Sequence, residues 1–269
     1  MNQEKIKVHF INSYLLNPTN PITVNLIGAG GTGSQVLTAL ARINQSLIAL
    51  GHAGLFVRVF DSDIVSKANL GRQLFADSEI GLNKAVVLIN RLNRFFGTNW
   101  KAFPYSYNKD NYQKLGQYKI ANLTITCVDT VTARFEIAEI LKGEAAEKIN
   151  HSCLPYYWLD FGNSQYTGQV VLSTICNIEQ PKSKRFTPVA RLPFITEEFK
   201  ALLEQSEEKD NTPSCSLAEA LTKQDLFINS ALANIGASLL WQMFREGMIT
   251  ARGFFLNLKQ FKTRPLMVA

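Results

Sequence analysis

The sequence predicts an α/β fold: a doubly wound, mostly parallel, Rossmann-like sheet with an antiparallel extension and a crossover loop. Three observations predict it. Short apolar runs rich in β-branched residues alternate with helical patterns from about residue 20 to residue 150. A glycine-rich turn directly follows the first of these runs, and an aspartate ends the second. Beyond residue 150, two strand-like runs are separated only by turn residues, which is typical of an antiparallel hairpin.

The first half of the chain, about 20–150, is expected to be a nucleotide-binding half in which strands and helices alternate. Compact apolar runs indicate buried strands, and apolar residues at every third or fourth position indicate helices. The predicted strands are 23–27, 55–60, 99–105 and 121–127. The predicted helices run from the glycine turn to about 51, over 82–96, over 111–115 and over 131–147, and the polar stretch 61–73 is expected to be a loop.

The second half, about 151–269, is expected to contain the antiparallel extension, the crossover loop and a C-terminal helix and strand. The hairpin strands are predicted at 156–161 and 169–175. A proline-rich loop over 177–214 surrounds one predicted helix at 197–203, and a helix over 224–244 precedes a strand over 253–258. We expect residues 1–269 to form a single domain without internal repeats.

Composition and charge narrow the class of protein. The chain is 46% hydrophobic, which excludes disorder as its main state. No apolar run approaches the roughly 20 residues of a membrane span, and the polar start of the chain is unlike a signal peptide, so we expect a cytoplasmic protein. The 28 basic and 22 acidic residues give a net charge of +6. The basic residues are scattered apart from a small cluster at 182–185, so direct nucleic-acid binding is not expected.

The glycine-rich turn 28–33, Gly-Ala-Gly-Gly-Thr-Gly, predicts a phosphate-binding site. The first glycine permits the tight turn, and the later ones allow close approach of a phosphate and close packing of the helix on the sheet. The start of that helix offers free N–H groups to an anion. Alone, the turn is compatible with NAD, FAD or ATP, or with a tight turn that binds no ligand. The predicted contacts are Gly28, Gly30, Gly31 and Gly33.

Two cationic residues favour a triphosphate over a dinucleotide. Arg72 lies in the motif Asn69-Leu70-Gly71-Arg72-Gln73, and Lys84 opens the next helix. Placed to converge on the glycine turn, they would offset much of the charge of a triphosphate. A lysine in the first turn of a helix runs against the helix dipole, which also favours a bound anion. The alternatives are that Arg72 is a surface cation and Lys84 an ordinary helix residue.

Carboxylates at the ends of two strands predict further contacts. Asp61 ends the second strand, where an acidic side chain can bond a ribose hydroxyl, and Asp63 follows it. Asp129 ends a later strand at the same edge of the sheet and can hold Mg²⁺ through oxygen ligands. The alternatives are that Asp61 and Asp63 cap a turn and that Asp129 caps the following helix.

In this order, five motifs resemble those of the ThiF/MoeB adenylyltransferases, which are relatives of the ubiquitin-activating enzymes. They are the glycine turn 28–33, Asp-Ser-Asp-Ile-Val at 61–65, Asn-Leu-Gly-Arg-Gln at 69–73, Gly81 with Lys84, and Cys-Val-Asp at 127–129. The segments 159–163 and 168–172 are most similar to the PRTRC-system ThiF branch. That branch is found in bacterial gene clusters that also encode a small ubiquitin-like protein.

The resemblance implies an activity and a set of roles. Such enzymes bind MgATP and the C-terminal carboxylate of a ubiquitin-like (β-grasp) or sulfur-carrier protein, and form an acyl-adenylate with release of pyrophosphate. By this resemblance, Asp61 would bind the ribose, with Asp63 nearby. Asn69 and Arg72 would bind phosphates, with Gln73 beside them. Lys84 would neutralise charge, and Asp129 would bind Mg²⁺. The plainer alternative for Asn69 is that it only fixes its loop.

The family also implies a homodimer. The apolar helix over 228–240 contains many small residues, and it is either a dimer contact or a core helix of one subunit. MoeB-like enzymes use an N-terminal arginine that reaches the ATP of the other subunit. No arginine precedes Gly28 in this chain, and Lys5 and Lys7 are the candidates to replace it.

The cysteines and histidines give little indication of catalysis or metal binding. The two CxxC pairs of zinc-binding relatives are absent, so no zinc is expected. Cys215 lies in the crossover loop, where similar proteins can carry a cysteine that forms a thioester or persulfide; the alternative is a loop residue without chemistry. We expect the remaining cysteines to be structural and each histidine to be an isolated surface or packed residue: Cys127, Cys153 and Cys176, and His9, His52 and His151.

Three other functions stay open at this point. A catalytically weak scaffold or half of a heterodimer is compatible with the missing N-terminal arginine. An NAD(P)-dependent oxidoreductase would not need Arg72 and Lys84 to converge. A small-molecule adenylyltransferase would keep the ATP site but lack a groove for a protein partner.

Overall fold

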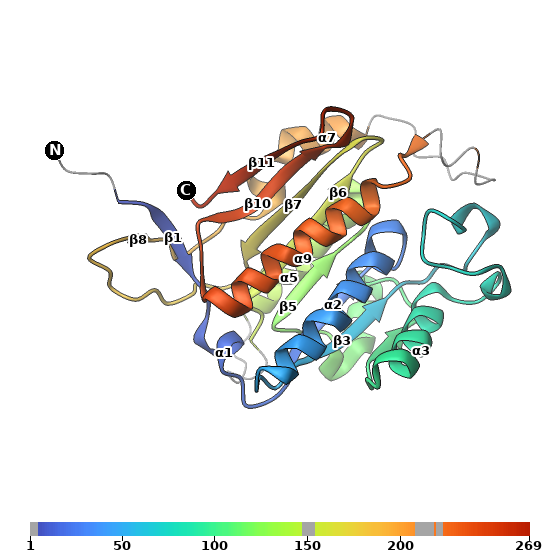
Figure 1. The fold of residues 1–269 in the computed structure, drawn as a ribbon, viewed down its shortest axis with the longest axis horizontal. Coiled ribbons are helices and arrows are strands. Elements are labelled where there is room, and N and C mark those ends of the chain that lie inside the picture. The colour runs from blue at the N-terminus through green and yellow to red at the C-terminus, as the bar shows by residue number, and fades with distance from the viewer. Residues whose placement is uncertain (1–4, 147–153, 208–217, 219–222) are drawn as a thin grey trace.

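The computed structural model describes residues 5–146, 154–207, 218 and 223–269, and a sheet of eight strands forms its centre (Figure 1). The strands are β2 (Ile22–Ile27), β3 (Leu55–Phe60), β4 (Lys101–Phe103), β5 (Leu123–Thr126), β6 (Tyr157–Asn163), β7 (Thr167–Thr174), β10 (Ala251–Asn257) and β11 (Lys262–Met267). Their order across the sheet is β11-β10-β7-β6-β5-β2-β3-β4. The neighbours from β4 to β6 pair in parallel, and those from β6 to β11 pair antiparallel. The predicted doubly wound sheet with an antiparallel extension is therefore confirmed.

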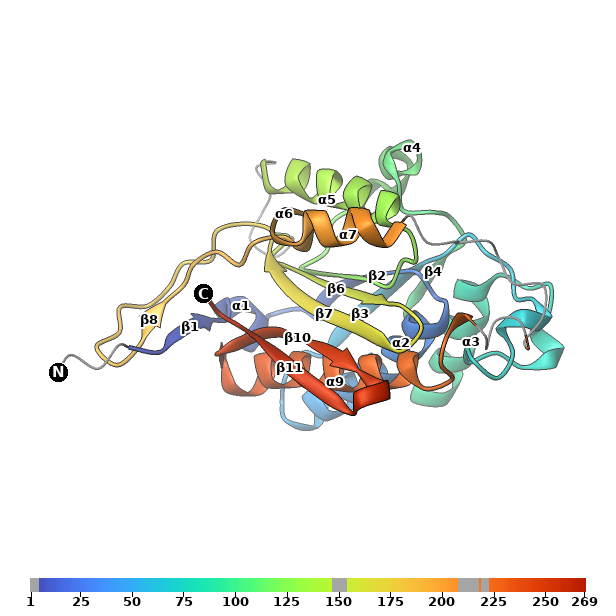
Figure 2. The same ribbon diagram turned by 90° about the horizontal axis from the view of Figure 1, so that it is seen from above.

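Helices cover both faces of the sheet (Figure 2). One face carries α2 (Gly31–Ala49), α3 (Lys84–Phe96) and α9 (Ile228–Glu246), and the other carries α4 (Lys109–Tyr112), α5 (Val131–Ala146), α6 (Ile195–Glu198) and α7 (Lys200–Glu207). Successive strand residues point to opposite faces. Leu26 accordingly packs into the cluster beneath α2 and α9, whereas Ile27 packs into the cluster on the side of α5. The core thus has two layers separated by the sheet.

Local signals explain where the helices begin and end. The Asn83 side chain accepts a hydrogen bond from the Val86 amide and so caps the start of α3. Gly97 then adopts a left-handed conformation with φ of 69° and ends it. Gly247 ends α9 in the same way, with φ of 64°. The helix predicted over 82–96 begins at Lys84, two residues later than predicted. The helix predicted over 224–244 runs from Ile228 to Glu246.

The prediction was wrong in detail for the crossover segment. Within 177–207 the chain forms a short strand, β8 (Thr187–Pro188), and the two helices α6 and α7 instead of one. The helices are separated because Phe199 leaves the helical conformation, with φ of −115° and ψ of 25°. The prediction also missed β11, where Pro265 interrupts the strand pattern. Proline is tolerated there because β11 is an edge strand.

A second, small sheet projects from the amino ends of the parallel strands (Figures 1 and 2). β1 (Lys7–Phe10) lies in it between β8 and β9 (Met248–Ile249), and α1 (Ser13–Leu16) follows β1. His9 anchors it, because its buried ring bonds the Val189 carbonyl at 2.6 Å and the Tyr157 hydroxyl at 2.9 Å. Lys5 and Lys7 are exposed at this end, opposite the glycine turn. A role for them beside a nucleotide would therefore need a second copy of the chain.

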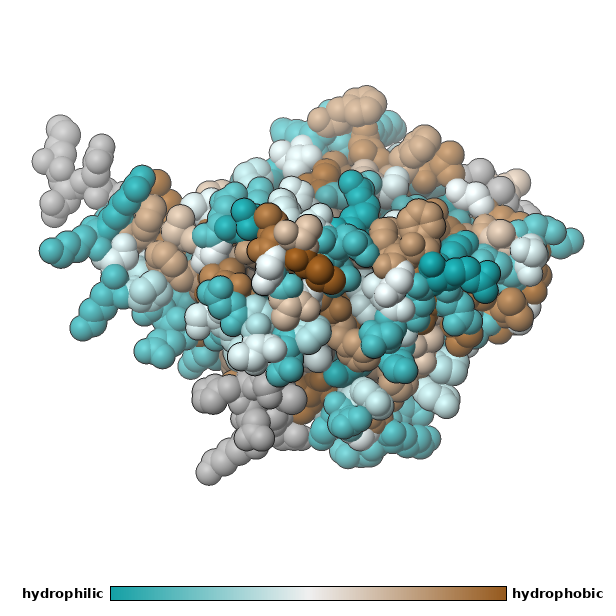
Figure 3. All heavy atoms as spheres, turned by 60° about the horizontal axis from the view of Figure 1, so that its bottom comes forward, coloured by the Kyte–Doolittle hydropathy of each residue, from teal (hydrophilic) through white to brown (hydrophobic). Residues whose placement is uncertain are grey.

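The helix α9 packs as a core element. Gly236 lets it lie close to the sheet, since a Cβ there would come within 2.4 Å of the Phe161 ring. Its exposed side carries Ile235, which is 37% exposed. On the face drawn in Figure 3, hydrophobic residues are interspersed with hydrophilic ones and form no continuous band. The predicted dimer contact through 228–240 stays a prediction. None of the helices in the described ranges has both the length and the apolar character to cross a bilayer.

Candidate functional site

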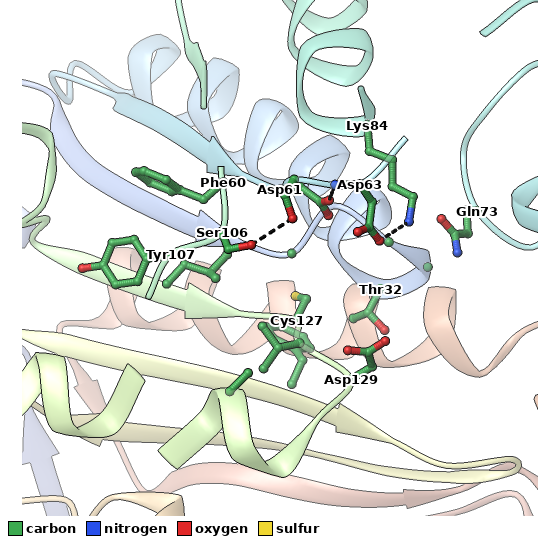
Figure 4. Close-up of a pocket in the computed structure, with 18 of the residues that line it drawn as sticks. Thr32, Phe60, Asp61, Asp63, Gln73, Lys84, Ser106, Tyr107, Cys127 and Asp129 are labelled. Atoms are coloured by element: carbon green, nitrogen blue, oxygen red, sulfur yellow. Dashed lines mark hydrogen bonds and ion pairs between the residues drawn. The ribbon is translucent and has the colours of Figure 1, made fainter. Parts of the chain in front are cut away.

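A cavity of about 440 Å³ opens at the carboxyl ends of the parallel strands (Figure 4). It lies at the end of β2, whose two neighbours in the sheet are β3 on one side and β5 on the other. Doubly wound sheets bind their ligands at this point. The volume falls within the usual range for a small-molecule site. Among the predicted site residues it is lined by Gly28, Gly30, Gly31, Asp61, Asp63, Arg72, Gln73, Lys84 and Asp129. The structure therefore brings most of the predicted residues together.

The glycine turn is shaped by close backbone contacts. Gly28 has φ of 92°, and a Cβ on it would lie 2.6 Å from the Cys127 carbonyl oxygen. Gly33 lies outside the cavity lining, and a Cβ there would meet the Gly28 oxygen at 1.9 Å. Gly30 is the N-cap of α2 and provides no side-chain cap, so the first N–H groups of this helix are left for a ligand.

Asp61 ties the glycine turn to the loop after β3. One carboxylate oxygen accepts the Ala29 amide at 2.6 Å, and the other accepts the Asp63 amide at 2.8 Å. Burial is the main influence on the pKa of Asp61 and raises it, while the two amide bonds act in the opposite direction. Asp61 therefore does cap a turn, and each of its oxygens keeps a lone pair for a further partner.

Lys84 is held at the cavity by its neighbours. Its ammonium donates to Asp63 Oδ2 at 2.9 Å, and the Lys84 side chain is only 9% exposed. Asn83, which the sequence analysis did not single out, donates to the carbonyl oxygens of Asp61 and Asp63. This contact clamps the Asp61–Asp63 loop to the start of α3 and so sets the position of Lys84.

Arg72 reaches the cavity from the polar loop after β3. Its Nη1 donates to Gln224 Oε1, and burial lowers its pKa without removing its charge. Arg72 Nε and Gln73 Oε1 are buried without a hydrogen-bond partner among the described residues. Unsatisfied buried polar atoms beside a cavity indicate a missing polar ligand.

Asn69 does not line the cavity. Its Oδ1 accepts the Ser66 amide at 2.8 Å and the Ser66 hydroxyl at 3.1 Å, across a 3-10 turn over Lys67–Asn69. This is the arrangement expected if Asn69 fixes its own loop. Its predicted contact with a phosphate stays a prediction.

Asp129 presents an exposed carboxylate that makes no hydrogen bond or ion pair with another described residue. The start of α5 is capped by Thr130 instead, whose hydroxyl accepts the Ala133 amide at 3.3 Å. The helix-cap alternative for Asp129 is thus wrong. No cluster of three or more His, Cys, Asp or Glu residues suited to a metal ion occurs in the described ranges.

Several cavity residues come from distant parts of the chain and were not predicted from the sequence. Gln224 lies just before α9, Asn229 lies in its first turn, and Asn163 ends β6. No local pattern marks them, because their position depends on how α9 packs against α2. Ser106, Tyr107 and Asn108 follow β4 at the same edge of the sheet, so the rule that located Asp61 could have located them.

Beside the cavity, Arg134 and Asp160 form a buried ion pair. Arg134 Nε lies 2.9 and 3.0 Å from the two Asp160 oxygens, and the side chains are 5% and 1% exposed. Arg134 Nη2 also donates to the Val128 carbonyl at 2.7 Å. The pair therefore holds the loop that carries Asp129.

Replacing Arg134 by methionine is expected to lower the free energy of unfolding by about 3–5 kcal/mol, because the Asp160 charge would stay buried without its partner. The measurement is urea unfolding followed by circular dichroism. The matched control is Arg191→Met, since Arg191 pairs with Glu197 at the surface and such pairs contribute about 1 kcal/mol or less. Equal effects of the two substitutions would contradict the assigned role.

Two of the four cysteines, Cys127 and Cys176, lie in the described parts of the chain. Cys127 lines the cavity, but burial and then the charge of Asp160 hold the pKa of its thiol well above the usual range. Burial likewise raises the pKa of Cys176. Both thiols are therefore poor nucleophiles. Cys153, Cys215 and His151 lie outside the described residues.

Comparisons with known structures identify the fold. PaaA aligns with a TM-score of 0.56 and 16% identity, over 92% of this chain and 64% of PaaA. E. coli MccB aligns with a TM-score of 0.57 and 15% identity, over 94% of this chain and 63% of MccB. MccB crystallised with ATP aligns with a TM-score of 0.53 and 15% identity, over 94% and 64% of the two chains.

This chain therefore spans less than two thirds of the length of these proteins, and at such identities the likeness establishes the fold alone. Among curated proteins, no sequence matches the chain. A family model does match, over residues 4–267, which is nearly the whole chain. The fold, the glycine turn and this match agree, and the chain belongs to the ThiF family.

Proposed function

We propose that this protein adenylates the C-terminal carboxylate of a small protein, with MgATP as the second substrate. The observation that carries the proposal is the meeting of two cationic side chains with a glycine turn. Arg72 and Lys84 line the same cavity as Gly30 and Gly31, although Arg72 lies in the loop after β3 and Lys84 is the first residue of α3. Two cations and the start of a helix suit a triphosphate better than the diphosphate of a dinucleotide.

The proposed reaction needs positioning and charge stabilisation more than acid–base chemistry. A carboxylate oxygen of the partner attacks the α-phosphorus of ATP, and the bond from that phosphorus to the bridging oxygen of the β-phosphate breaks. Pyrophosphate leaves with the electron pair, and an acyl-adenylate remains. The attacking carboxylate is ionised at pH 7, so no general base is required at this step.

The described residues divide the work. Asp61 accepts hydrogen bonds from the ribose while it holds the glycine turn. Arg72, and Lys84 when it turns from Asp63 to the phosphates, offset the charge that develops on the phosphates. Ser106, Tyr107 and Asn108 also line the cavity, and in this proposal they lie on the side of the base.

The donor set also fits a magnesium ion. Mg²⁺ is usually bound through one or two carboxylates together with substrate phosphates and water, so a cluster of three acidic residues is not required. Asp129 offers one exposed carboxylate in the cavity, with no competing partner in the described parts of the chain. The ion would supply charge neutralisation at the phosphates.

The partner we propose is a ubiquitin-like or sulfur-carrier protein of the β-grasp type that ends in glycine. Membership of the ThiF family supports this, and MccB has been crystallised with MccA as well as with ATP. A homodimer, a cytoplasmic location and a covalent intermediate on Cys215 belong to the same proposal. Membership of the PRTRC branch stays a prediction.

ATP–pyrophosphate exchange tests the proposal. Radiolabel should pass from pyrophosphate into ATP when a β-grasp protein ending in glycine is present, and much more slowly when its terminal glycine is deleted. An exchange rate that is the same with and without the carrier protein would favour a small-molecule adenylyltransferase. Binding of NADH in place of ATP would favour an oxidoreductase, and the absence of both activities would favour a scaffold.

A further inference from the structure

A relay of hydrogen bonds connects Arg72 to the first turn of α2. Arg72 Nη1 donates to Gln224 Oε1, which also accepts from Asn229 Nδ2 at 3.0 Å. Asn229 Oδ1 accepts from the Thr32 hydroxyl at 2.9 Å and from Asn163 Nδ2 at 3.0 Å. Asn229 is 2% exposed and Thr32 is 7% exposed, so water does not compete for the bond between them.

The chemistry of arginine fixes the direction of every bond in this relay. A guanidinium can only donate, so the atom of Gln224 that faces Arg72 must be the carbonyl oxygen. That oxygen can only accept, so Asn229 must turn its amide nitrogen toward it. The Asn229 oxygen then faces Thr32, and the Thr32 hydroxyl must donate to it.

Thr32 has therefore used its one proton inside the protein. Only lone pairs remain on Oγ1 for a ligand in the cavity. Such an oxygen attracts a cation and repels a phosphate oxygen. Thr32 and Asp129 line the same cavity, and both side chains point into it in Figure 4.

We propose that the Thr32 hydroxyl and the Asp129 carboxylate together bind the divalent cation that accompanies the nucleotide, with Thr32 Oγ1 as an oxygen ligand. The inference rests on the proposed function, because the phosphates of the nucleotide complete the coordination. Two oxygen ligands from the protein, with phosphates and water, make up an ordinary Mg²⁺ site. Asn229, Gln224 and Arg72 act as positioning residues that orient the Thr32 lone pairs.

The test measures cation binding instead of activity. Mn²⁺ replaces Mg²⁺, the nucleotide is the non-hydrolysable analogue AMPCPP, and free Mn²⁺ is measured by electron paramagnetic resonance. Thr32→Val keeps the shape of the side chain and removes its oxygen, so Mn²⁺ affinity should fall roughly tenfold or more, as for other altered metal sites. Thr32→Ser keeps the oxygen and should bind Mn²⁺ like the original protein, and Thr32→Ala should repeat the loss.

Thr38→Val is the matched control. Thr38 lies on the same helix, and its hydroxyl bonds the Ser34 carbonyl at 3.1 Å. It does not line the cavity, so this substitution should leave Mn²⁺ affinity unchanged. AMPCPP affinity in EDTA should be the same for all four variants, because the Thr32 hydroxyl makes no bond to phosphate and no variant changes a backbone N–H group.

Two results would overturn the inference alone. One is normal Mn²⁺ affinity in Thr32→Val; the other is a loss of metal-free AMPCPP affinity in that variant, which would mean that the hydroxyl donates to a phosphate. If the original protein fails to bind AMPCPP together with Mn²⁺, the proposed function fails and this inference fails with it.

Discussion

Asp129→Ala is expected to lower the rate of magnesium-dependent ATP–pyrophosphate exchange by about a thousandfold or more, since removing one group that stabilises transition-state charge costs about 10²–10³ and metal binding would be lost as well. Asp129 is the exposed carboxylate that reaches into the cavity from the end of β5 without a partner among the described residues. The substitution removes no hydrogen bond found within the described ranges, so the free energy of unfolding should change little.

The control for this substitution is Asp77→Ala. Asp77 is exposed in the 3-10 turn Asp77–Glu79 and lies outside the cavity lining. It should retain full exchange. Raising the magnesium concentration should partly restore exchange in Asp129→Ala if the carboxylate holds the ion. Full exchange in this variant at ordinary magnesium concentration would show that Asp129 has no part in the reaction.

Lys84→Met is the second substitution with a large expected effect. Methionine keeps most of the volume of this buried side chain and removes its charge. Exchange should fall by about two to three orders of magnitude, in line with other single cations or donors that stabilise a transition state. Substrate binding should fall less than the rate, because the charge develops mainly as pyrophosphate departs.

Lys67→Met is the matched control for Lys84→Met. Lys67 is exposed in the loop after β3 and does not line the cavity. Its replacement should leave exchange within about twofold, since a distant exposed charge is largely screened. If Lys84→Met and Lys67→Met behave alike, Lys84 only neutralises Asp63 and the proposed site loses one of its two cations.

The sequence predicted those parts of the fold that depend on local patterns. The alternation of β2, α2 and β3, the glycine turn and the position of Asp61 all follow from residue order, because parallel strands present their carboxyl ends at one edge. The edge strand β11 and the small sheet of β1, β8 and β9 were missed. The pairing of the small sheet joins residues far apart in the sequence, and no local periodicity encodes it. β11 pairs with its chain neighbour β10, and it was missed because Pro265 interrupts its strand pattern.

In the candidate site, too, residues in local motifs could be predicted and residues placed by long-range packing could not. The motif residues Asp61, Arg72, Lys84 and Asp129 line one cavity, and their places at the ends of parallel strands and in the adjoining motifs predict that they meet. The relay through Gln224 and Asn229 was not, because it exists only after α9 packs beside α2. Thr32 belongs to the glycine turn that the sequence shows, but the direction of its hydrogen bond follows only from the position of Asn229 in the structure.

A crystal structure with AMPCPP and Mg²⁺ would show whether the cavity holds a magnesium-bound nucleoside triphosphate. We expect triphosphate density above Gly30 and Gly31, with Arg72 and Lys84 at its phosphates and the metal beside Asp129. Density for the nucleotide elsewhere, or phosphates that approach neither Arg72 nor Lys84, would contradict it.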